Sequence, residues 1–234
     1  MSLRLHAKRT ARNLAKALVL NYGQYMQYSA KIDRINRRPL FHDFVQKTQK
    51  SSNIPSFSSR EAMWQFIIDE SPAAIDFLEF GVHEGHSILY FARQNRSINS
   101  RFFGFDTFTG LPEDWHRDFR RGCFDTGGRI PQTDDSRVRF VTGLFQETLP
   151  EFLSGFKTEN RIIVNIDCDL YSSTLYCLTR LDAILPKGTI LIFDEFGDVQ
   201  HEFRAVDDYT SSYRREFKVI CAHSNFYTMA VELL

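Results

Sequence analysis

Three acidic residues stand directly after hydrophobic segments that have the composition of buried strands. Asp167 follows Ile162–Ile166, and the pair Asp194 and Glu195 follows Thr189–Phe193. The parallel strands of an open α/β sheet present their carboxyl ends to the ligand crevice, so we expect these acids to converge there. Converging carboxylates repel one another strongly unless a cation or a shared proton offsets the charge. The pattern therefore predicts a hard metal ion beside a bound cofactor.

A glycine-containing turn after an earlier strand predicts the place of that cofactor. Gly81 and Gly85 let the backbone turn sharply and approach a ligand, and the helix that follows points its positive end at the ligand. The G-x-x-x-G spacing lacks the middle glycine that makes room for a pyrophosphate in the dinucleotide fingerprint. Glu79 would repel a pyrophosphate but would accept a hydrogen bond from the amino group of S-adenosylmethionine. Asp106 ends the next strand, 21 residues beyond Gly85, and is placed to bind both ribose hydroxyls.

Structural roles for the same residues stay open at this stage. The glycine turn alone is also typical of tight packing between a helix and a strand. Asp169 or Ser172 would serve equally well as the cap of the helix that follows them. Asp194 or Glu195 would satisfy backbone donors in a loop. His83 and His86 lie within the glycine turn, and nothing in the sequence marks either as a ligand.

The elements that must position these residues alternate between strands and helices. Continuous apolar strands separated by helices indicate a mainly parallel sheet covered on both faces. The expected strands are Ile75–Phe80, Phe102–Phe105, Val138–Thr142, Arg161–Ile166, Thr189–Phe193, Phe217–Ala222 and Phe226–Leu233. The expected helices between them are Gly85–Gln94, Gln146–Leu153, Ser172–Leu185 and His201–Glu216, with a long loop over Thr107–Ser136.

The end of the chain breaks the parallel rhythm. The last two strands are separated by only His223-Ser224-Asn225, a link that permits an antiparallel hairpin but no crossover. A parallel sheet that ends in one reversed strand is the layout of class I methyltransferases, and most dinucleotide dehydrogenases lack it. We therefore predict an α/β fold, Rossmann-like and of the class I methyltransferase type. It has a mainly parallel seven-stranded sheet, one antiparallel terminal strand and helices on both faces.

Composition excludes several other classes of protein. The 234 residues include 29 basic and 29 acidic ones, whereas a protein that tracks nucleic-acid phosphates normally has a basic excess. No apolar run approaches the roughly 18 residues that span a bilayer, so we expect no membrane partner. The four cysteines form no C-x-x-C pair and follow no secretory signal, which favours reduced thiols and a cytoplasmic location.

The first 57 residues are expected to form helical and loop material outside a domain spanning residues 58–234. Ser58 and Glu61 form a capping-box signature that opens a helix running to about Asp69, and Pro72 ends it. The first 31 residues carry no acid but several basic residues, Arg4, Lys8, Arg9, Arg12 and Lys16. Such a segment is compatible with an organelle transit peptide. We favour an amphipathic helix that packs on a partner subunit or forms a lid over the site.

The chain resembles the macrocin O-methyltransferase family, whose members methylate sugar hydroxyls of macrolide and aminocoumarin antibiotics. The resemblance covers about residues 58–234 and is strongest at Ile166-Asp167-Cys168-Asp169-Leu170-Tyr171-Ser172-Ser173-Thr174. Its other motifs are Leu78–Ser87, Gly104–Glu113, Gly143–Pro150 and Leu185–Gly188, the last leading into Phe193-Asp194-Glu195. The family implies a class I fold, S-adenosylmethionine and a magnesium ion.

Site residues follow from the resemblance one by one. It implies that Asp167, Asp194 and Glu195 bind magnesium and that Asp169 is the catalytic base. If the strand geometry persisted, Asp167 and Asp169, two residues apart, would face the same side. The cofactor residues it implies are Glu79, Gly81, Gly85, Ser87, Asp106 and Thr107. Glu195 departs from the family, which usually has a second aspartate there.

The acceptor site is less well defined by sequence. Relatives use their N-terminal part for the acceptor pocket and for dimer contacts, and no segment here matches it, although a homodimer is implied. Trp115, Tyr171 and Phe145 are expected pocket walls, with core packing favoured for Phe145. His201, on the helix that follows Glu195, is expected either to approach the metal or the substrate or to occupy an exposed position.

The function expected from all of this is magnesium-dependent transfer of a methyl group from S-adenosylmethionine to a hydroxyl of a small molecule, such as a sugar or vicinal diol of a natural product. Two alternatives remain open. One is a nicotinamide-dependent oxidoreductase, which the glycine spacing and the terminal hairpin disfavour. The other is a catalytically silent nucleoside-binding or scaffold protein, against which the intact set of acids argues.

Overall fold

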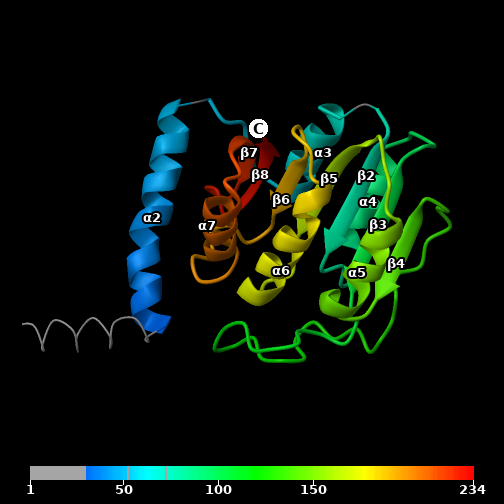
Figure 1. Ribbon diagram of the computed structural model, residues 1–234, viewed down its shortest axis with the longest axis horizontal. Helices are drawn as coiled ribbons and strands as arrows, with labels where there is room; N and C mark the ends of the chain where they lie inside the picture. The colour runs from blue at the N-terminus through cyan, green and yellow to red at the C-terminus, as the bar shows by residue number, and fades with distance from the viewer. Residues whose placement is uncertain (1–29, 52, 72) are drawn as a thin grey trace, which may run out of the picture.

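The computed structural model describes residues 30–51, 53–71 and 73–234 and consists of one sheet with helices on both faces (Figure 1). The sheet has eight strands in the order β1-β7-β8-β6-β5-β2-β3-β4. The strands are β1 (Ser56–Phe57), β2 (Ile75–Phe80), β3 (Arg101–Asp106), β4 (Val138–Thr142), β5 (Arg161–Ile166), β6 (Ile190–Phe193), β7 (Phe217–His223) and β8 (Thr228–Leu233). The helices are α2 (Ala30–Ser51), α3 (Arg60–Asp69), α4 (His86–Gln94), α5 (Phe145–Gly155), α6 (Tyr171–Leu181) and α7 (Glu202–Tyr213), with a 3-10 turn η1 (Asp182–Ile184).

The predicted topology, a mainly parallel sheet with one reversed strand, is confirmed. Strands β2 to β6 pair in parallel, and β8 is antiparallel to both of its neighbours, β6 and β7. The seven expected strands are all present. The two-residue strand β1 adds an eighth, pairing Ser56 with Ala222 and Phe57 with His223 in parallel. A strand of two residues is too short to show alternation in sequence, so it was not predicted.

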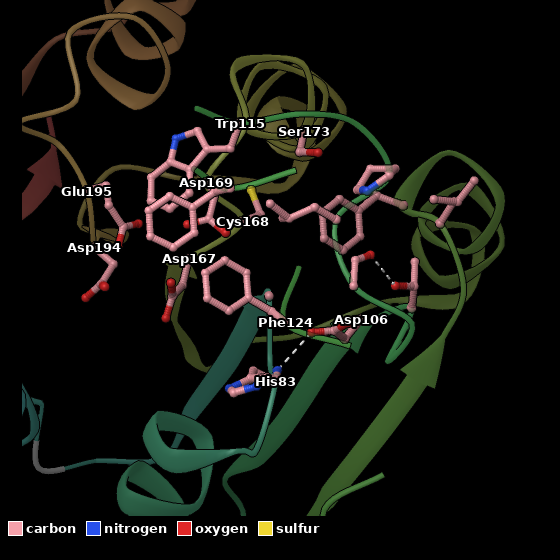
Figure 2. Close-up of a pocket in the computed structure, with 18 of the residues that line it drawn as sticks. His83, Asp106, Trp115, Phe124, Asp167, Cys168, Asp169, Ser173, Asp194 and Glu195 are labelled. Atoms are coloured by element: carbon pink, nitrogen blue, oxygen red, sulfur yellow. Dashed lines mark hydrogen bonds between the residues drawn. The ribbon is translucent and has the colours of Figure 1, made fainter. Parts of the chain in front are cut away.

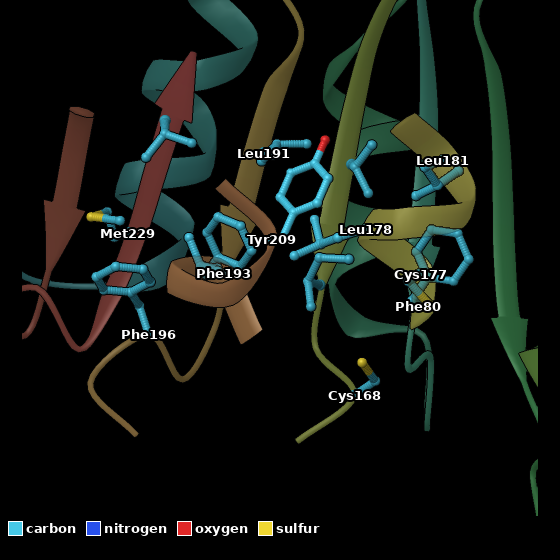
Figure 3. Packing of buried hydrophobic residues seen from close by; sticks show 14 of the residues in the cluster. Phe80, Cys168, Cys177, Leu178, Leu181, Leu191, Phe193, Phe196, Tyr209 and Met229 are labelled. Carbon is cyan, nitrogen blue, oxygen red and sulfur yellow. The ribbon is translucent and has the colours of Figure 1, made fainter. Parts of the chain in front are cut away.

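Alternating side chains of the central strands divide the core into two layers. On one face Phe80, Leu191, Phe193 and similar residues pack against α5, α6 and α7 (Figure 3). On the other face Phe77 and its neighbours pack against α3 and α4. The period of two along each strand produces both layers. Because both faces are covered, the site must lie at the carboxyl ends of the strands.

Several element boundaries differ from the sequence expectations, and four of the differences have a clear local cause. The cap of α3 is Ser59 rather than Ser58: its Oγ accepts the Ala62 N–H at 3.2 Å from an extended backbone. Helix α6 stops at Leu181 and tightens into η1, and α7 stops before Arg214, which adopts a left-handed conformation. Strand β8 begins at Thr228 because the three residues Ser224 to Phe226 all have positive φ and form the turn.

Helix α2 lies alongside the rest of the fold, next to α7 (Figure 1). Its Phe41 and Phe44 pack on the core residues Phe196 and Phe203, with ring centroids 5.3 to 6.3 Å apart. The basic segment before residue 30, and Pro72, lie outside the described residues. Within the described part of the chain no helix is both long and apolar enough to cross a membrane.

Candidate active site

The glycine turn after β2 is built against the end of β5. Gly81 has φ +93°, and a Cβ there would lie 1.7 Å from the backbone oxygen of Asp167. Its N–H donates to the Phe105 carbonyl at 3.0 Å. Only glycine fits this position, because both the conformation and the close approach exclude a side chain. The turn therefore fixes the relative positions of the ends of β2, β3 and β5.

Asp106 organises the same turn from the end of β3. Its Oδ2 accepts the Val82 and His83 N–H groups at 2.7 and 2.8 Å, and its Oδ1 accepts the Phe108 N–H at 2.7 Å. Figure 2 shows this carboxylate beside His83. Asp106 and Thr107 line the cavity described below. Asp106 therefore lies where a residue that binds the ribose hydroxyls of the cofactor is expected.

The other predicted cofactor residues lie behind the turn. Glu79 is fully buried, and its Oε1 accepts hydrogen bonds from Ser87 Oγ and from Asn165 Nδ2, the latter at 2.8 Å. Its Oε2 is buried without a partner among the described residues. Burial raises the pKa of Glu79 to about 8, against the opposing hydrogen bonds. Glu79, Gly85 and Ser87 do not line the cavity, whereas Gly81 does.

The three predicted metal ligands come together. One oxygen each of Asp167, Asp194 and Glu195 lies within 4.8 Å of the others, at the ends of β5 and β6 (Figure 2). Asp194 and Glu195 are 4 % and 8 % exposed. The Arg60 guanidinium lies 2.8 Å from Asp194 Oδ2 and faces the group from α3. Glu195 Oε2 is buried without a partner in the described part of the chain.

The carboxylates of this acid group repel one another, and a cation or a shared proton would relieve the repulsion. Burial, and then the charges of Asp194 and Asp169, raise the pKa of Asp167 well above its usual range. Burial also raises the pKa of Asp194, although Arg60 opposes the change. The pKa of Glu195 is raised by burial and by its acidic neighbours. Oxygen donors alone, several of them charged, suit magnesium, so the residues present fit that ion.

Glu202, which the sequence did not single out, supports the acid group from α7. It is fully buried, and its Oε2 accepts the Glu195 N–H at 2.9 Å. Burial and the nearby Cys168 and Asp194 raise its pKa well above the usual range. This contact fixes the backbone of Glu195.

Asp169 also faces the cavity, but not by continuation of the strand. β5 ends at Ile166, and Asp169 has a left-handed backbone with φ +61°. Burial, followed by the charges of Asp194 and Asp198, raises its pKa to about 7. Helix α6 has Leu170 at its N-cap and no side-chain cap, so neither Asp169 nor Ser172 caps it.

These residues surround a cavity of about 430 Å³, the site cavity. Gly81, Asp106 and Thr107 line one part of it, and Asp167, Asp169, Asp194 and Glu195 another. Its aromatic wall consists of Trp115, Phe119, Phe124 and Phe145. Of the expected walls, Trp115 and Phe145 line the cavity, whereas the Tyr171 hydroxyl instead donates to Asp208 at 3.0 Å. The sequence did not predict that Arg60, Phe119 and Phe124 line the cavity. Phe119 and Phe124 lie in a long loop, and Arg60 lies at the start of a helix, where no repeating pattern marks a site residue.

A second group of possible ligands lies beside the cavity. His116, Asp198 and His201 also bring donor atoms within 4.8 Å of one another. The Tyr171 N–H donates to His201 Nδ1 at 3.1 Å, so the neutral ring carries its proton on Nε2. A cation that binds Nε2 would have to displace that proton, and one that binds Nδ1 would have to displace the Tyr171 N–H. His201 therefore packs beside the site without being a ready ligand.

Comparison with known sequences confirms the family resemblance. The model of the macrocin-O-methyltransferase (TylF) family matches residues 128–220. A curated relative from Streptomyces olivaceus, 8-demethyl-8-(2,3-dimethoxy-alpha-L-rhamnosyl)-tetracenomycin-C 4'-O-methyltransferase, is 29% identical over 158 residues. That match covers 55% of this chain and 58% of the relative, less than two thirds of the relative's length.

Comparison with solved structures confirms the fold. The calicheamicin methyltransferase CalS11 superposes with a TM-score of 0.56 at 19% identity, covering 93% of this chain and 91% of that one. The O-methyltransferase NovP gives 0.53 at 21% identity, covering 74% and 78%. An O-methyltransferase from Bacillus cereus in complex with SAH gives 0.53 at 16% identity, covering 82% and 89%.

Proposed function

We propose that this chain, with its methyltransferase fold and family match, is a magnesium-dependent O-methyltransferase that uses S-adenosylmethionine. The acceptor is a hydroxyl of a small molecule, a sugar or vicinal diol of a natural product. One observation carries the proposal: the convergence of Asp167, Asp194 and Glu195 beside the glycine turn, at the edge of the site cavity. Two similar proteins support the acceptor class, because both act on rhamnose-containing substrates. They are the tetracenomycin methyltransferase from Streptomyces olivaceus and CalS11, a TDP-rhamnose 3'-O-methyltransferase.

The residues divide the work by position. The catalytic domain begins slightly before the expected boundary at residue 58, because Ser56 and Phe57 belong to its sheet, and it extends to residue 234. The part before it contributes to the homodimer or to a lid. Gly81, Asp106 and Thr107 contact the cofactor, and Glu79, Gly85 and Ser87 hold the turn that carries it. Asp167, Asp194 and Glu195 would hold the magnesium ion. When bound, magnesium supplies positive charge that lowers the pKa of a bound hydroxyl and stabilises the alkoxide.

Asp169 is the base of the proposed reaction. It faces the site cavity beside the acid group and takes the proton of the acceptor hydroxyl. The acceptor oxygen then forms a bond to the methyl carbon as the carbon–sulfur bond breaks. The electron pair of that bond passes to sulfur, and the products are a methyl ether and S-adenosylhomocysteine. The walls of the cavity align the two reactants for this in-line displacement.

Transfer of a labelled methyl group tests the proposal. The protein is incubated with labelled S-adenosylmethionine and methyl α-L-rhamnopyranoside or other vicinal diols, with magnesium or with EDTA. We expect a methyl ether that forms only with magnesium. Calorimetry with S-adenosylhomocysteine separates the alternatives. Binding without transfer to any diol points to a silent nucleoside-binding protein. No heat with S-adenosylhomocysteine, together with heat on adding NADH, points to an oxidoreductase.

A further inference from the structure

Asp198 fastens the long loop between β3 and β4 to the segment that carries Glu195. Its Oδ2 accepts the Trp115 Nε1–H at 3.0 Å and lies 2.7 Å from His116 Nε2. Both partners are more than 80 residues away in sequence. The side chain of Asp198 is 8% exposed, so water competes little for this oxygen. Two donors on one carboxylate oxygen make a strong attachment.

Asp198 is itself held firmly in place. Its N–H donates to the Glu195 carbonyl at 2.8 Å, and its Oδ1 accepts the Gln200 N–H at 3.0 Å. Its carbonyl accepts the N–H groups of His201 and Phe203, both at 3.2 Å. The carboxylate therefore has a fixed position relative to the acid group.

The attachment determines where the aromatic wall stands. Trp115 lies 5.2 Å from Phe119 between ring centroids, and Phe119 stacks on Phe124 at 5.8 Å with 19° between the planes. Phe119 and Phe124 are 40% and 41% exposed although they line the site cavity. Large exposed aromatic faces beside convergent polar groups are typical of a ligand pocket. They provide a flat surface for the apolar face of a ring-shaped acceptor.

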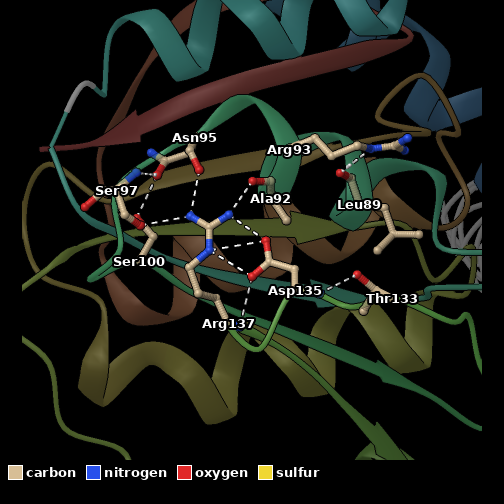
Figure 4. A network of polar contacts seen from close by, with 9 residues as sticks. All are labelled: Leu89, Ala92, Arg93, Asn95, Ser97, Ser100, Thr133, Asp135 and Arg137. Carbon is tan, nitrogen blue, oxygen red and sulfur yellow. Dashed lines mark hydrogen bonds and ion pairs between the residues drawn. The ribbon is translucent and has the colours of Figure 1, made fainter.

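The far end of the same loop is fixed separately. Arg137 binds Asp135 through both carboxylate oxygens and donates to the carbonyls of Ala92, Asn95 and Ser97 (Figure 4). These contacts lie at the start of β4, away from the aromatic wall. Ser172 Oγ of α6 also donates to Glu113, two residues before Trp115. Among these attachments, the one at Asp198 holds the Trp115 side chain itself.

We propose that Asp198 is a positioning residue that determines affinity for the methyl acceptor by holding Trp115 in the wall of the site cavity. This inference depends on the proposed function in one respect, which is that the molecule bound against the aromatic wall is taken to be the methyl acceptor. Asp198 acts through Trp115 and touches neither the cofactor nor the reacting atoms. Its loss therefore releases the wall and leaves the acid group and the glycine turn in place.

Tryptophan fluorescence tests the attachment without any need for activity. The chain has two tryptophans, Trp64 and Trp115. Trp64 is buried, and its Nε1 has no partner among the described residues, so Trp64→Phe removes no hydrogen bond. In this variant Trp115 is the only tryptophan that fluoresces. In that background Asp198→Ala should red-shift the emission and raise the acrylamide quenching constant about twofold, as a released ring meets solvent. The matched control Asp135→Asn, in the same loop, should leave quenching unchanged.

Two further variants keep this test decisive if Asp198→Ala does not fold. Asp198→Asn keeps one acceptor oxygen and should give intermediate quenching. His116→Ala removes one donor and leaves Asp198 intact, so it should also raise quenching. Quenching that stays at the parent value in all folded variants would overturn the proposal.

Kinetics with methyl α-L-rhamnopyranoside give the second readout. Asp198→Ala should raise the acceptor KM about tenfold, the effect of losing one hydrogen bond to a charged group. The Kd for S-adenosylhomocysteine should stay within about twofold, and kcat should change less than KM, through loss of the Asp198 charge that helps raise the pKa of Asp169. Asp198→Asn should recover part of the KM. A fall in kcat and cofactor affinity with unchanged KM would refute the positioning role. If the wild type transfers no methyl group, the proposed function fails, and quenching still decides the role of Asp198.

Discussion

Arg60 Nη1 lies 2.8 Å from Asp194 Oδ2, so a cation at the start of α3 faces a buried carboxylate at the end of β6. Arg60 and His83 are the only basic side chains that line the site cavity within the described residues. The acid group includes Asp167, Asp194 and Glu195, with Asp169 beside it. One guanidinium offsets only part of that charge, and this imbalance is the physical reason to expect a divalent ion.

Replacing Arg60 should change the response to magnesium. Arg60→Gln removes a positive charge next to the proposed ion, so we expect lower stability without metal and a larger rise in Tm on adding magnesium than in the wild type. Differential scanning calorimetry measures both. Lys47→Gln, at an exposed position on α2, is the control and should respond like the wild type. An equal magnesium effect in Arg60→Gln would mean that Arg60 lies outside the field of the ion.

Asp167→Asn should abolish turnover while retaining cofactor affinity. The amide removes one charged ligand from the acid group, whereas the glycine turn and Asp106 remain. Turnover is expected to fall by at least about a thousandfold, with the Kd for S-adenosylhomocysteine within about threefold. Labelled methyl transfer and calorimetry give the two values. Undiminished turnover would remove Asp167 from the site.

The Glu195 N–H donates a hydrogen bond to Glu202, and this bond predicts different outcomes for two substitutions of Glu202. Glu202→Gln keeps an acceptor oxygen and should retain most of the magnesium affinity. Glu202→Leu leaves a buried N–H without a partner, which costs about 1–3 kcal/mol. We expect a lower Tm and a higher magnesium concentration for half-maximal activity in the leucine variant. Identical behaviour of the two variants would show that the hydrogen bond does not position Glu195.

Gly81→Ala should prevent folding or abolish cofactor binding. The new Cβ would lie 1.7 Å from the Asp167 backbone oxygen, at a φ of +93°. Gly122 is a matched control, because its φ is +84° and no atom of the described residues would lie within 4 Å of an added Cβ. Gly122→Ala should cost only the backbone strain, about 1–2 kcal/mol. Chemical denaturation of both variants would reveal the difference, and similar losses would mean that the clash at Gly81 relaxes.

Glu79 predicts a pH dependence of stability. Its pKa is raised from 4.5 to about 8 in the folded protein, so between these values the folded state holds a proton that the unfolded state has lost. The stabilising contribution is therefore complete below about pH 4.5 and is lost as the pH rises to about 8. Glu79→Gln should lack this component, so the Tm of the wild type should fall relative to the variant across that window. The exposed Glu84→Gln should show no such trend, and parallel Tm curves for wild type and Glu79→Gln would contradict the shift.

The strand-end acids and the glycine turn were predictable from sequence because they depend on local patterns. A hydrophobic segment followed by a carboxylate, as at Ile166 and Asp167, identifies a strand end without knowledge of the fold. The parallel topology then brings the ends of β5 and β6 together. The sequence also predicted the reversed strand, since the link after β7 is too short for a crossover.

The aromatic wall and its attachment were not predictable in the same way. The contact between Trp115 and Asp198 joins residues 83 positions apart, and neither belongs to a repeating pattern. Arg60 carried no signal beyond its place next to the expected capping box, although it faces Asp194. The left-handed conformation of Asp169 also has no sequence signal, because such a backbone is rare for a non-glycine residue and is imposed by its surroundings.

The position of β8 within the sheet affects how the protein folds during synthesis. β8 lies between β6 and β7, so the strand that ends in Asp194 and Glu195 has an unpaired edge until Thr228–Leu233 has left the ribosome. Until then, the growing chain exposes a hydrophobic strand edge that invites incorrect pairing. The edge of the strand that carries the acid group is therefore covered only once Thr228–Leu233 has emerged and paired.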